Sequence, residues 1–142
     1  MSSYTIITTS YRDKREEINY VRTAVFIEEQ SVPPDLEIDG RDDRCLHALA
    51  LDGGRPVGTG RIDLEKNGKV GRVAVLRGHR GRGIGTRLME ALVAVAREHS
   101  LHSVWFHAQQ SAIPFYEKLG YSVEGDCFME AGIPHRTMFK RI

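Results

Sequence analysis

The hydrophobic and polar positions in the middle of the chain form short strand-like segments separated by turns. Residues 46–51 and 57–64 are strand-like and flank a glycine turn at residues 52–54, which favours a hairpin. A second turn, Asn67-Gly68, leads into the apolar residues 70–76. This pattern predicts a three-stranded antiparallel meander.

The N-terminal region combines one strand with a helical segment. Residues 4–9 contain β-branched and aromatic side chains and predict a short first strand. From Arg12 onward apolar residues recur at helical spacing, and the proline pair at residues 33–34 stops any helix before it. We therefore expect one or two helices between the first strand and the meander.

A glycine-rich stretch, residues 78–85, separates the meander from a helix. The strand that follows, residues 103–107, can lie parallel to the strand before the loop, because a helix crosses between them. The apolar face of the helix is expected to consist of Leu88, Leu92, Val95 and Ala96.

The C-terminal part predicts one further helix and a strand pair. Residues 113–119 form a short helix closed by Gly120, and residues 121–123 and 137–140 form the last two strands. The predicted class is α/β (α+β): a mixed, mostly antiparallel sheet that contains one parallel strand pair and has helices on both faces.

Composition excludes several classes of protein. The 142 residues predict a single domain over residues 1–142, and 41% hydrophobic with 27% charged residues is typical of folded soluble chains. A net charge of +1 disfavours general nucleic-acid binding. Cys45 and Cys127 form no metal or redox motif, and no membrane or export segment is apparent, so we expect a cytoplasmic protein with reduced thiols.

The charges nevertheless separate into two blocks. Between Lys66 and Met89 there are seven bases and no acid, whereas residues 27–43 contain seven acids and a single base, Arg41. Most charge runs are solvated surface, but the basic block here coincides with the glycine stretch. That coincidence makes it a candidate anion site.

Glycines before a helix expose backbone N–H groups at the positive end of the helix dipole, which suits a phosphate. A Walker loop fits poorly, because Ile84-Gly85 follows Gly83 where Lys and Ser or Thr are needed. A dinucleotide-binding G-x-G-x-x-G motif fits poorly too, because Gly81, Gly83 and Gly85 are spaced by two throughout.

A third pattern, R-x-x-G-x-G between a strand and a helix, is matched by Arg80, Gly83 and Gly85. About thirty residues later, the run FYEKLGY within residues 112–121 matches a second motif, F-Y-x-x-x-G-[FY]. With these two motifs in this order, the chain resembles the GNAT superfamily, the general-control-related N-acetyltransferases. The resemblance covers most of the chain.

The resemblance implies the GNAT fold, acetyl-CoA as acyl donor and no metal. In that family the loop binds the pyrophosphate through main-chain amides, and the strand before it splays from its parallel neighbour and pairs with the pantetheine arm. A main-chain amide near Val75 would then polarise the thioester carbonyl. The implied cofactor-binding residues are Val73, Ala74, Val75, Arg80, Gly81, Arg82, Gly83, Ile84, Gly85 and Thr86.

Transfer of an acetyl group to an amine needs a neutral amine, donors for the developing oxyanion and a proton for the departing thiolate. The resemblance places Tyr116 beside the thioester sulfur as general acid. The strand before the loop lacks the glutamate that some members use as base, since it reads Lys69-Val70-Gly71-Arg72. Glu28 or Glu29 is the candidate base; Glu37, Asp39, His107 or a water molecule stay open, and His135 is a candidate pocket residue.

The acidic block favours a cationic acceptor by Coulomb attraction, so we expect a small-molecule or peptidyl primary amine. Direct transfer in a ternary complex is expected, since neither cysteine accompanies a base motif. A non-catalytic acyl-CoA sensor of the same fold is the alternative. An RNA- or nucleotide-binding protein is disfavoured, because no aromatic residue lies between Ile27 and Leu101. The sequence leaves a longer acyl donor and a homodimer open.

Overall fold

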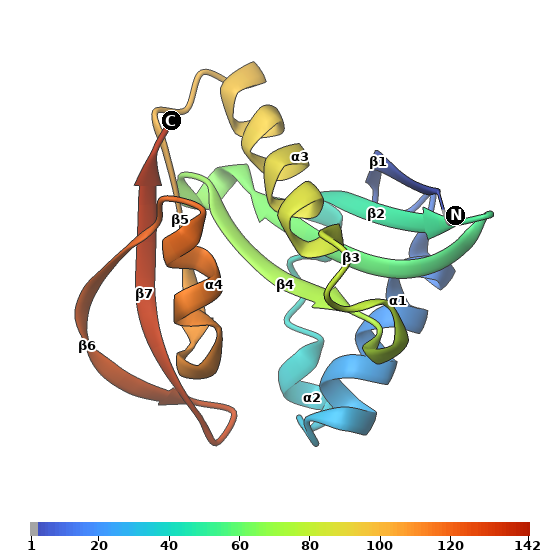
Figure 1. The fold of residues 1–142 in the computed structure, drawn as a ribbon, viewed down its shortest axis with the longest axis horizontal. Coiled ribbons are helices and arrows are strands. Elements are labelled where there is room, and N and C mark those ends of the chain that lie inside the picture. The colour runs from blue at the N-terminus through green and yellow to red at the C-terminus, as the bar shows by residue number, and fades with distance from the viewer. Residues whose placement is uncertain (1–2) are drawn as a thin grey trace.

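A seven-stranded mixed sheet organises residues 3–142, the part of the chain that the computed structural model describes (Figure 1). Its strand order is β1-β2-β3-β4-β5-β7-β6, and every neighbouring pair is antiparallel except β4 and β5. The strands are β1 (Tyr4–Ser10), β2 (Leu46–Asp52), β3 (Arg55–Asp63), β4 (Lys69–Val75), β5 (Ser103–Gln109), β6 (Ser122–Glu130) and β7 (Ile133–Arg141).

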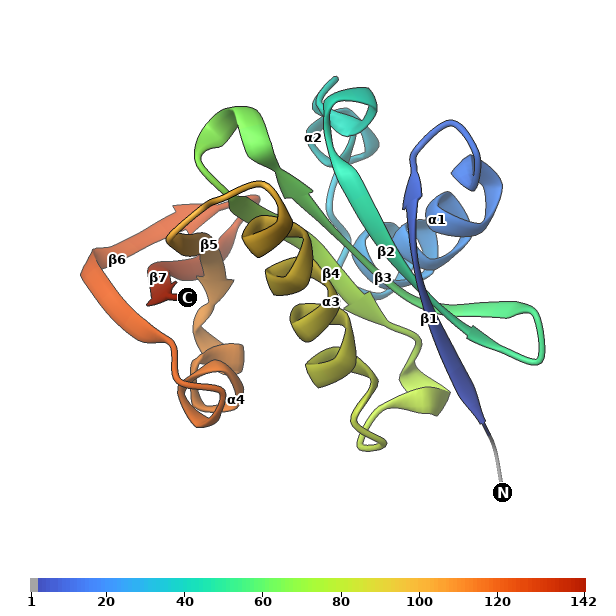
Figure 2. The ribbon, with the colours of Figure 1, turned by 90° about the horizontal axis from the view of Figure 1, so that it is seen from above.

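Helices cover both faces of the sheet, as Figure 2 shows for the half formed by β1 to β4. α1 and α2 lie on one face, and α3 lies on the other. The helices are α1 (Arg15–Arg22), α2 (Pro34–Glu37), α3 (Ile84–Glu98) and α4 (Ile113–Lys118), with a π-helical turn, η1 (Thr23–Glu29), directly after α1. The predicted fold class is confirmed.

The predicted meander is confirmed, with small changes in its boundaries. β2, β3 and β4 pair antiparallel, and the β2–β3 turn uses Gly53 and Gly54, both at positive φ. A two-residue turn of this kind matches the twist of the strands it joins. β3 begins at Arg55, earlier than expected, and Leu64 already belongs to a 3₁₀ turn.

The final hairpin is much longer than the sequence predicts. β6 and β7 have nine residues each instead of the short segments expected at residues 121–123 and 137–140. β6 is an edge strand whose side chains are mostly exposed, so its sequence lacks the apolar alternation that marks a half-buried strand. β7 lies between β6 and β5 and thereby extends the sheet.

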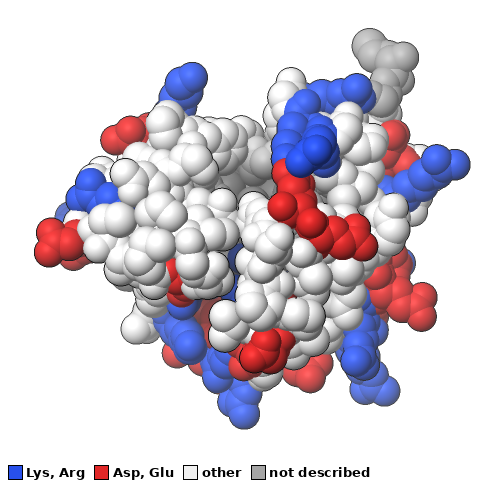
Figure 3. Space-filling model, turned by 90° about the horizontal axis from the view of Figure 1, so that it is seen from below, with Lys and Arg blue, Asp and Glu red and all other residues white. Residues whose placement is uncertain are grey.

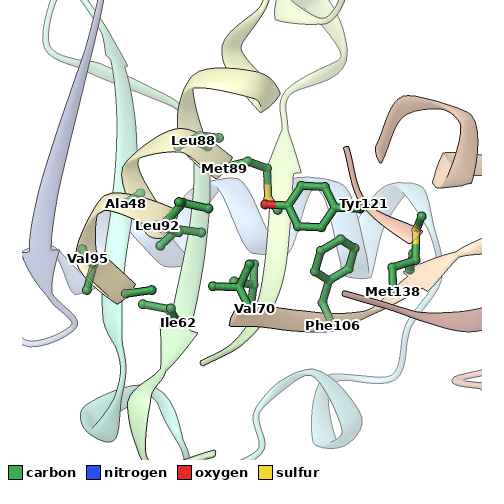
Figure 4. Close-up of a cluster of buried hydrophobic side chains, with 14 of the residues drawn as sticks. Ala48, Ile62, Val70, Leu88, Met89, Leu92, Val95, Phe106, Tyr121 and Met138 are labelled. Carbon is green, nitrogen blue, oxygen red and sulfur yellow. The ribbon is translucent and has the colours of Figure 1, made fainter. Parts of the chain in front are cut away.

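α3 holds the two halves of the molecule together. The four residues predicted as its apolar face are all buried. They pack on Ala48, Ile62 and Val70, and the same cluster continues through Met89 to Phe106, Tyr121 and Met138 of the β5–β7 half (Figure 4). This shared core keeps the halves in place although little backbone pairing joins them.

None of the helices in residues 3–142 combines the length and the apolar character required to cross a membrane.

Candidate active site

A cleft opens where β4 and β5 separate. One residue pair, Lys69 with Trp105, joins the two strands among the described residues, whereas other neighbouring strands pair over five to seven residues. The cavity between them has a volume of about 440 Å³. Figure 3 shows a hollow between two lobes of the molecule on the side seen from below.

A β-bulge in β4 accompanies this separation. Thr59 and Arg61 of β3 pair with Ala74 and Gly71, so β4 contains one extra residue at this point. Arg72 adopts a φ of 53°, an uncommon conformation for a residue with a side chain. Gly60 lies opposite, where a Cβ would come within 3.2 Å of the Val73 side chain. Bulges bend a strand and change the direction of its side chains, and here the bulge lies in the wall of the cleft.

The cleft runs through the sheet from one face to the other. Along β5, Phe106 and Ala108 belong to the core on the α3 and α4 side, and Tyr116 of α4 packs on Phe106. The alternate residues face the α1 side, where the Gln109 amide donates to the Gln30 side-chain oxygen at 2.8 Å. Because both Tyr116 and His107 line the cavity, a molecule bound on one face can meet a molecule bound on the other.

The glycine loop presents free main-chain donors next to this cleft. Within residues 3–142, no backbone or side-chain acceptor is bonded to the N–H groups of residues 81–86. Gly81 and Gly83 have φ values of 77° and 80°, and no atom lies within 4 Å of where their Cβ atoms would be. Both the space and the helix dipole therefore favour an anion here.

The arginines of the loop already have protein partners. Arg80 donates to both carboxylate oxygens of Glu29, at 2.8 and 2.7 Å, and to the Val75 carbonyl at 2.9 Å. Arg82 donates to the Tyr4 hydroxyl at 2.8 Å. The Arg80 hydrogen bonds, with help from Arg77, lower the pKa of Glu29 to about 2. Glu29 is therefore an ionised partner of the loop.

A buried network of ion pairs forms the wall of the cleft on the α1 side. Arg22, 1% exposed, donates to Glu37 at 2.6 Å and to Asp42 at 2.6 Å. Arg61 also pairs with Asp42 at 2.8 Å. Further pairs in this network join Arg61 with Asp39, Arg72 with Glu37 and Asp39, and Arg41 with Asp63 and Glu65. These contacts fix the segment around α2 onto α1, β3 and β4.

The network keeps its carboxylates ionised. Burial by itself would raise the pKa of Asp42, but the hydrogen bonds from Arg22 and Arg61 outweigh burial and lower it. The same balance, with Arg61 and the Arg41 amide as donors, lowers the pKa of Asp39. A buried charge is tolerated only with such partners, so the acids and arginines depend on one another.

Tyr116 presents a hydroxyl group that has no hydrogen-bond partner in the described part of the chain. Its ring packs against Phe106, with centroids 4.5 Å apart, and against Phe115 at 5.0 Å. Burial raises the pKa of Tyr116 to about 12. The hydroxyl therefore keeps its proton at neutral pH and can donate it.

Two histidines and a glutamate line the cleft from β5, β6 and β7. His107 Nδ1 lies 3.2 Å from one carboxylate oxygen of Glu130, and His135 Nε2 lies 3.6 Å from the other. His135 is held further by the Ile133 carbonyl, 2.7 Å from its Nδ1. His107 Nε2 has no partner within residues 3–142. A carboxylate on one ring nitrogen orients a histidine and leaves the other nitrogen to face the cleft.

Comparison with known proteins identifies the family. The family model described as Acetyltransferase (GNAT) family matches residues 8–121, which is most of the chain. The chain belongs to the GNAT acetyltransferase family. An uncharacterized N-acetyltransferase of Bacillus subtilis, YjcF, is 42% identical over 123 residues, which cover 85% of this chain and 88% of the relative.

Solved structures agree with this assignment. A Lactobacillus plantarum protein described as an N-acetyltransferase superposes with a TM-score of 0.88 at 30% identity and covers 98% of both chains. An acyl-CoA N-acyltransferase from Pseudomonas aeruginosa gives a TM-score of 0.85 at 27% identity, with coverage of 97% of this chain and 99% of that chain.

Of the residues that the GNAT resemblance implies for the acyl donor, Val73 lines the cleft, and the others follow it along β4 and into the glycine loop. Ala74 is buried against Val21 and Val25, and Val75 packs on the main core. The loop from Arg80 to Thr86 follows, and Ile84 is buried beneath it. This placement matches a donor that runs from the loop along β4, which remains a proposal.

The candidate bases separate into two groups. Glu28 and Glu29 lie beside a different hollow next to Leu76 and Arg77, and neither lines the cleft. Of the other candidates, Glu37 and Asp39 line the cleft but are bound to arginines. His107 lines the cleft without a guanidinium partner among the described residues.

Sequence reasoning missed two residues of this GNAT cleft. The sequence carries no signal for Glu130, because it is the last residue of an exposed edge strand and no motif surrounds it. Lys69 drew attention only as part of the stretch that lacks the glutamate used by some family members, although it lines the cavity. Neither position carries a local signal, since strand pairing between distant segments brings both into the site.

The ion pairs of the cleft wall and of the glycine loop predict acid sensitivity. The pKa values of Asp39, Asp42, Glu29 and Asp63 are all lowered in the folded state, so the unfolded chain binds more protons. The free energy of unfolding is expected to be fully present above about pH 5 and to fall progressively below it. Urea denaturation at a series of pH values measures this slope. Asp42→Asn should be less stable at pH 7 and show a shallower slope, and an unchanged slope would contradict the coupling.

Proposed function

We propose that the protein transfers an acetyl group from acetyl-CoA to a primary amine by direct attack in a ternary complex. The observation that supports this most is the cleft through the sheet, lined by Tyr116, together with the free amides of the glycine loop that follows β4. The GNAT family membership and the similarity to an acyl-CoA N-acyltransferase support an acyl-CoA donor.

The donor would bind from the α3 side. The N–H groups of residues 81–86 suit the pyrophosphate, because an anion at a helix N-terminus interacts favourably with several donors and the dipole. Beyond Lys69, β4 forms no ladder with β5, so its edge can pair with the amides of the pantetheine arm. A main-chain N–H of β4 near Val75 would then polarise the thioester carbonyl.

The acceptor amine would approach from the α1 side. Its nitrogen attacks the thioester carbon, an N–C bond forms and the C–S bond breaks. His107 Nε2 would take the proton from the amine, with Glu130 holding the other ring nitrogen. Tyr116 would give a proton to the departing thiolate. His107 thus replaces Glu28 and Glu29 as the proposed base, because it lies in the cleft with a free nitrogen.

Replacing Tyr116 tests the acid. Tyr116→Phe keeps the ring packing and removes the proton, so turnover is expected to fall about 100-fold or more while acetyl-CoA affinity stays within twofold. Free thiol release with a panel of amines gives turnover, and calorimetry gives the dissociation constant. Phe115→Leu, which removes a neighbouring ring but no proton, is the control. Unchanged turnover in Tyr116→Phe would exclude this role, and a protein that binds no acetyl-CoA would contradict the proposed function.

His107→Gln tests the base. Glutamine cannot accept the proton, so we expect the maximal rate to fall about 100-fold with acetyl-CoA affinity unchanged. His102→Gln, an exposed histidine just before β5, is the matched control and should behave as wild type. An equal effect of both variants, or none in His107→Gln, would exclude His107.

Glu29→Gln tests whether Glu29 is an ion-pair partner of the loop arginines or the catalytic base. Loss of the carboxylate leaves Arg80 with an uncompensated charge, so acetyl-CoA should bind about two- to fivefold more tightly, as expected for a partly exposed ion pair. Turnover at saturation should be unchanged. Glu28→Gln is the matched control and should change neither quantity. A large loss of turnover in Glu29→Gln at unchanged affinity would instead identify Glu29 as the base.

A further inference from the structure

The charges that line the cleft do not balance. Five Lys and Arg side chains and four Asp and Glu side chains face it: Arg41, Arg61, Lys66, Lys69 and Arg72 against Glu37, Asp39, Asp63 and Glu130. The three arginines are each paired with one of the acids. Glu130 lies against the two histidines. Among the described residues, the two lysines are therefore the cations of the cleft that have no acidic partner.

Lys69 is the better placed of the two. In residues 3–142 no carboxylate lies within 4 Å of its ammonium group, which stands over the Trp105 ring at 5.3 Å from the centroid. Its side chain is half-buried in the wall of the cleft at the one point where β4 and β5 meet. Lys66, which also lines the cleft, is more exposed.

The charged groups around Lys69 are mostly positive, so together they favour a bound anion. Burial, the neighbouring Lys66, and Arg61 and Arg72 lower the pKa of Lys69, and Glu130 opposes them only in part. Positive charge thus exceeds negative charge around this ammonium group. A half-buried cation with no protein partner interacts more strongly with an anion than one in open solvent does.

We propose that the acceptor amine carries an anionic group, a carboxylate or a phosphate, which Lys69 binds at the α1-side end of the cleft. This inference rests on the proposed function and specifies its substrate class. The Trp105 ring neighbours both groups, with its centroid 5.3 Å from the Lys69 ammonium nitrogen and 5.7 Å from the ring centroid of His107. The anion would rest on Lys69 while the amine reaches His107 and the thioester.

The proposal replaces the expectation of a purely cationic acceptor. That expectation assumed that the acids of residues 27–43 are free to attract an amine. In the structure Glu37 and Asp39, the acids of this block that line the cleft, are both bound to arginines, so neither is free to attract an amine there. The opposite charge, on Lys69, is the one available to a ligand.

The charge of the reaction product tests the proposal. The protein is incubated with acetyl-CoA bearing a heavy-isotope acetyl group and a small-molecule extract of bacterial cells, and labelled products are separated by electrophoresis at pH 7 with mass detection. Acetylation removes the charge of the attacked amine, so a labelled product whose remaining ionised group is a carboxylate or phosphate migrates to the anode, and fragment masses identify either group in a product that keeps a second amine. Labelled products that contain neither a carboxylate nor a phosphate would overturn the proposal while leaving the transferase function intact. Absence of any labelled product would contradict the proposed function itself.

Variants of Lys69 then test the residue, using the acceptor so identified and its analogue without the anionic group. Lys69→Met should raise the KM of the anionic acceptor about tenfold or more, with kcat and acetyl-CoA affinity within twofold, and should leave the KM of the analogue unchanged. Lys69→Arg keeps the charge and should restore most of the affinity. Lys14→Met, on the surface near α1, should behave as wild type. An equal change of KM for both acceptors, or none, would exclude Lys69 as the anion subsite.

Discussion

The separation of β4 from β5 determines the rest of the structure. Parallel neighbours in a sheet normally satisfy each other's backbone groups along their whole length, but here a single residue pair joins them. The extra residue in β4 and the glycine opposite it bend the strand at this point. The halves stay together because α3 packs on both, through one apolar core that continues from Ile62 to Met138. The opening is therefore supported by side-chain packing.

The charged wall of the cleft shows how an acidic segment and a basic sheet neutralise one another. Arg22 and Arg61 share Asp42 inside the protein, and Glu37 joins Arg22 to Arg72 on β4. Removing one member would leave a buried charge without a partner, which is far more costly than losing a surface ion pair. These ion pairs occupy the arginines that line the cleft. Among the described residues, Lys69 is then the half-buried cation of the cleft without an acidic partner.

The two ends of the cleft have different chemical characters. At the end proposed for the donor, the available groups are main-chain amides, which glycines expose at the positive end of the helix dipole, while Arg80 and Arg82 are held by Glu29 and Tyr4. At the acceptor end, side chains from β4, β5, β6 and β7 converge. Under the proposed function, main-chain recognition would tolerate many side chains in the loop, whereas the proposed acceptor end would depend on the identity of a few residues, such as Lys69 and His107.

The sequence by itself determined the meander, the glycine loop, the apolar face of α3 and the two motifs that indicate a GNAT protein. These are local patterns, in which the spacing of apolar residues or glycines follows directly from the geometry of one element. It did not determine the length of the β6–β7 hairpin, because an edge strand with exposed side chains carries no alternation. Only the tertiary structure decided which charges are free. Glu29 and Asp39 look alike in the sequence as possible bases, yet arginines distant in the chain, Arg80 and Arg61, bind them. Glu130 and Lys69 acquire their place in the cleft in the same way, through pairing of strands far apart in the chain.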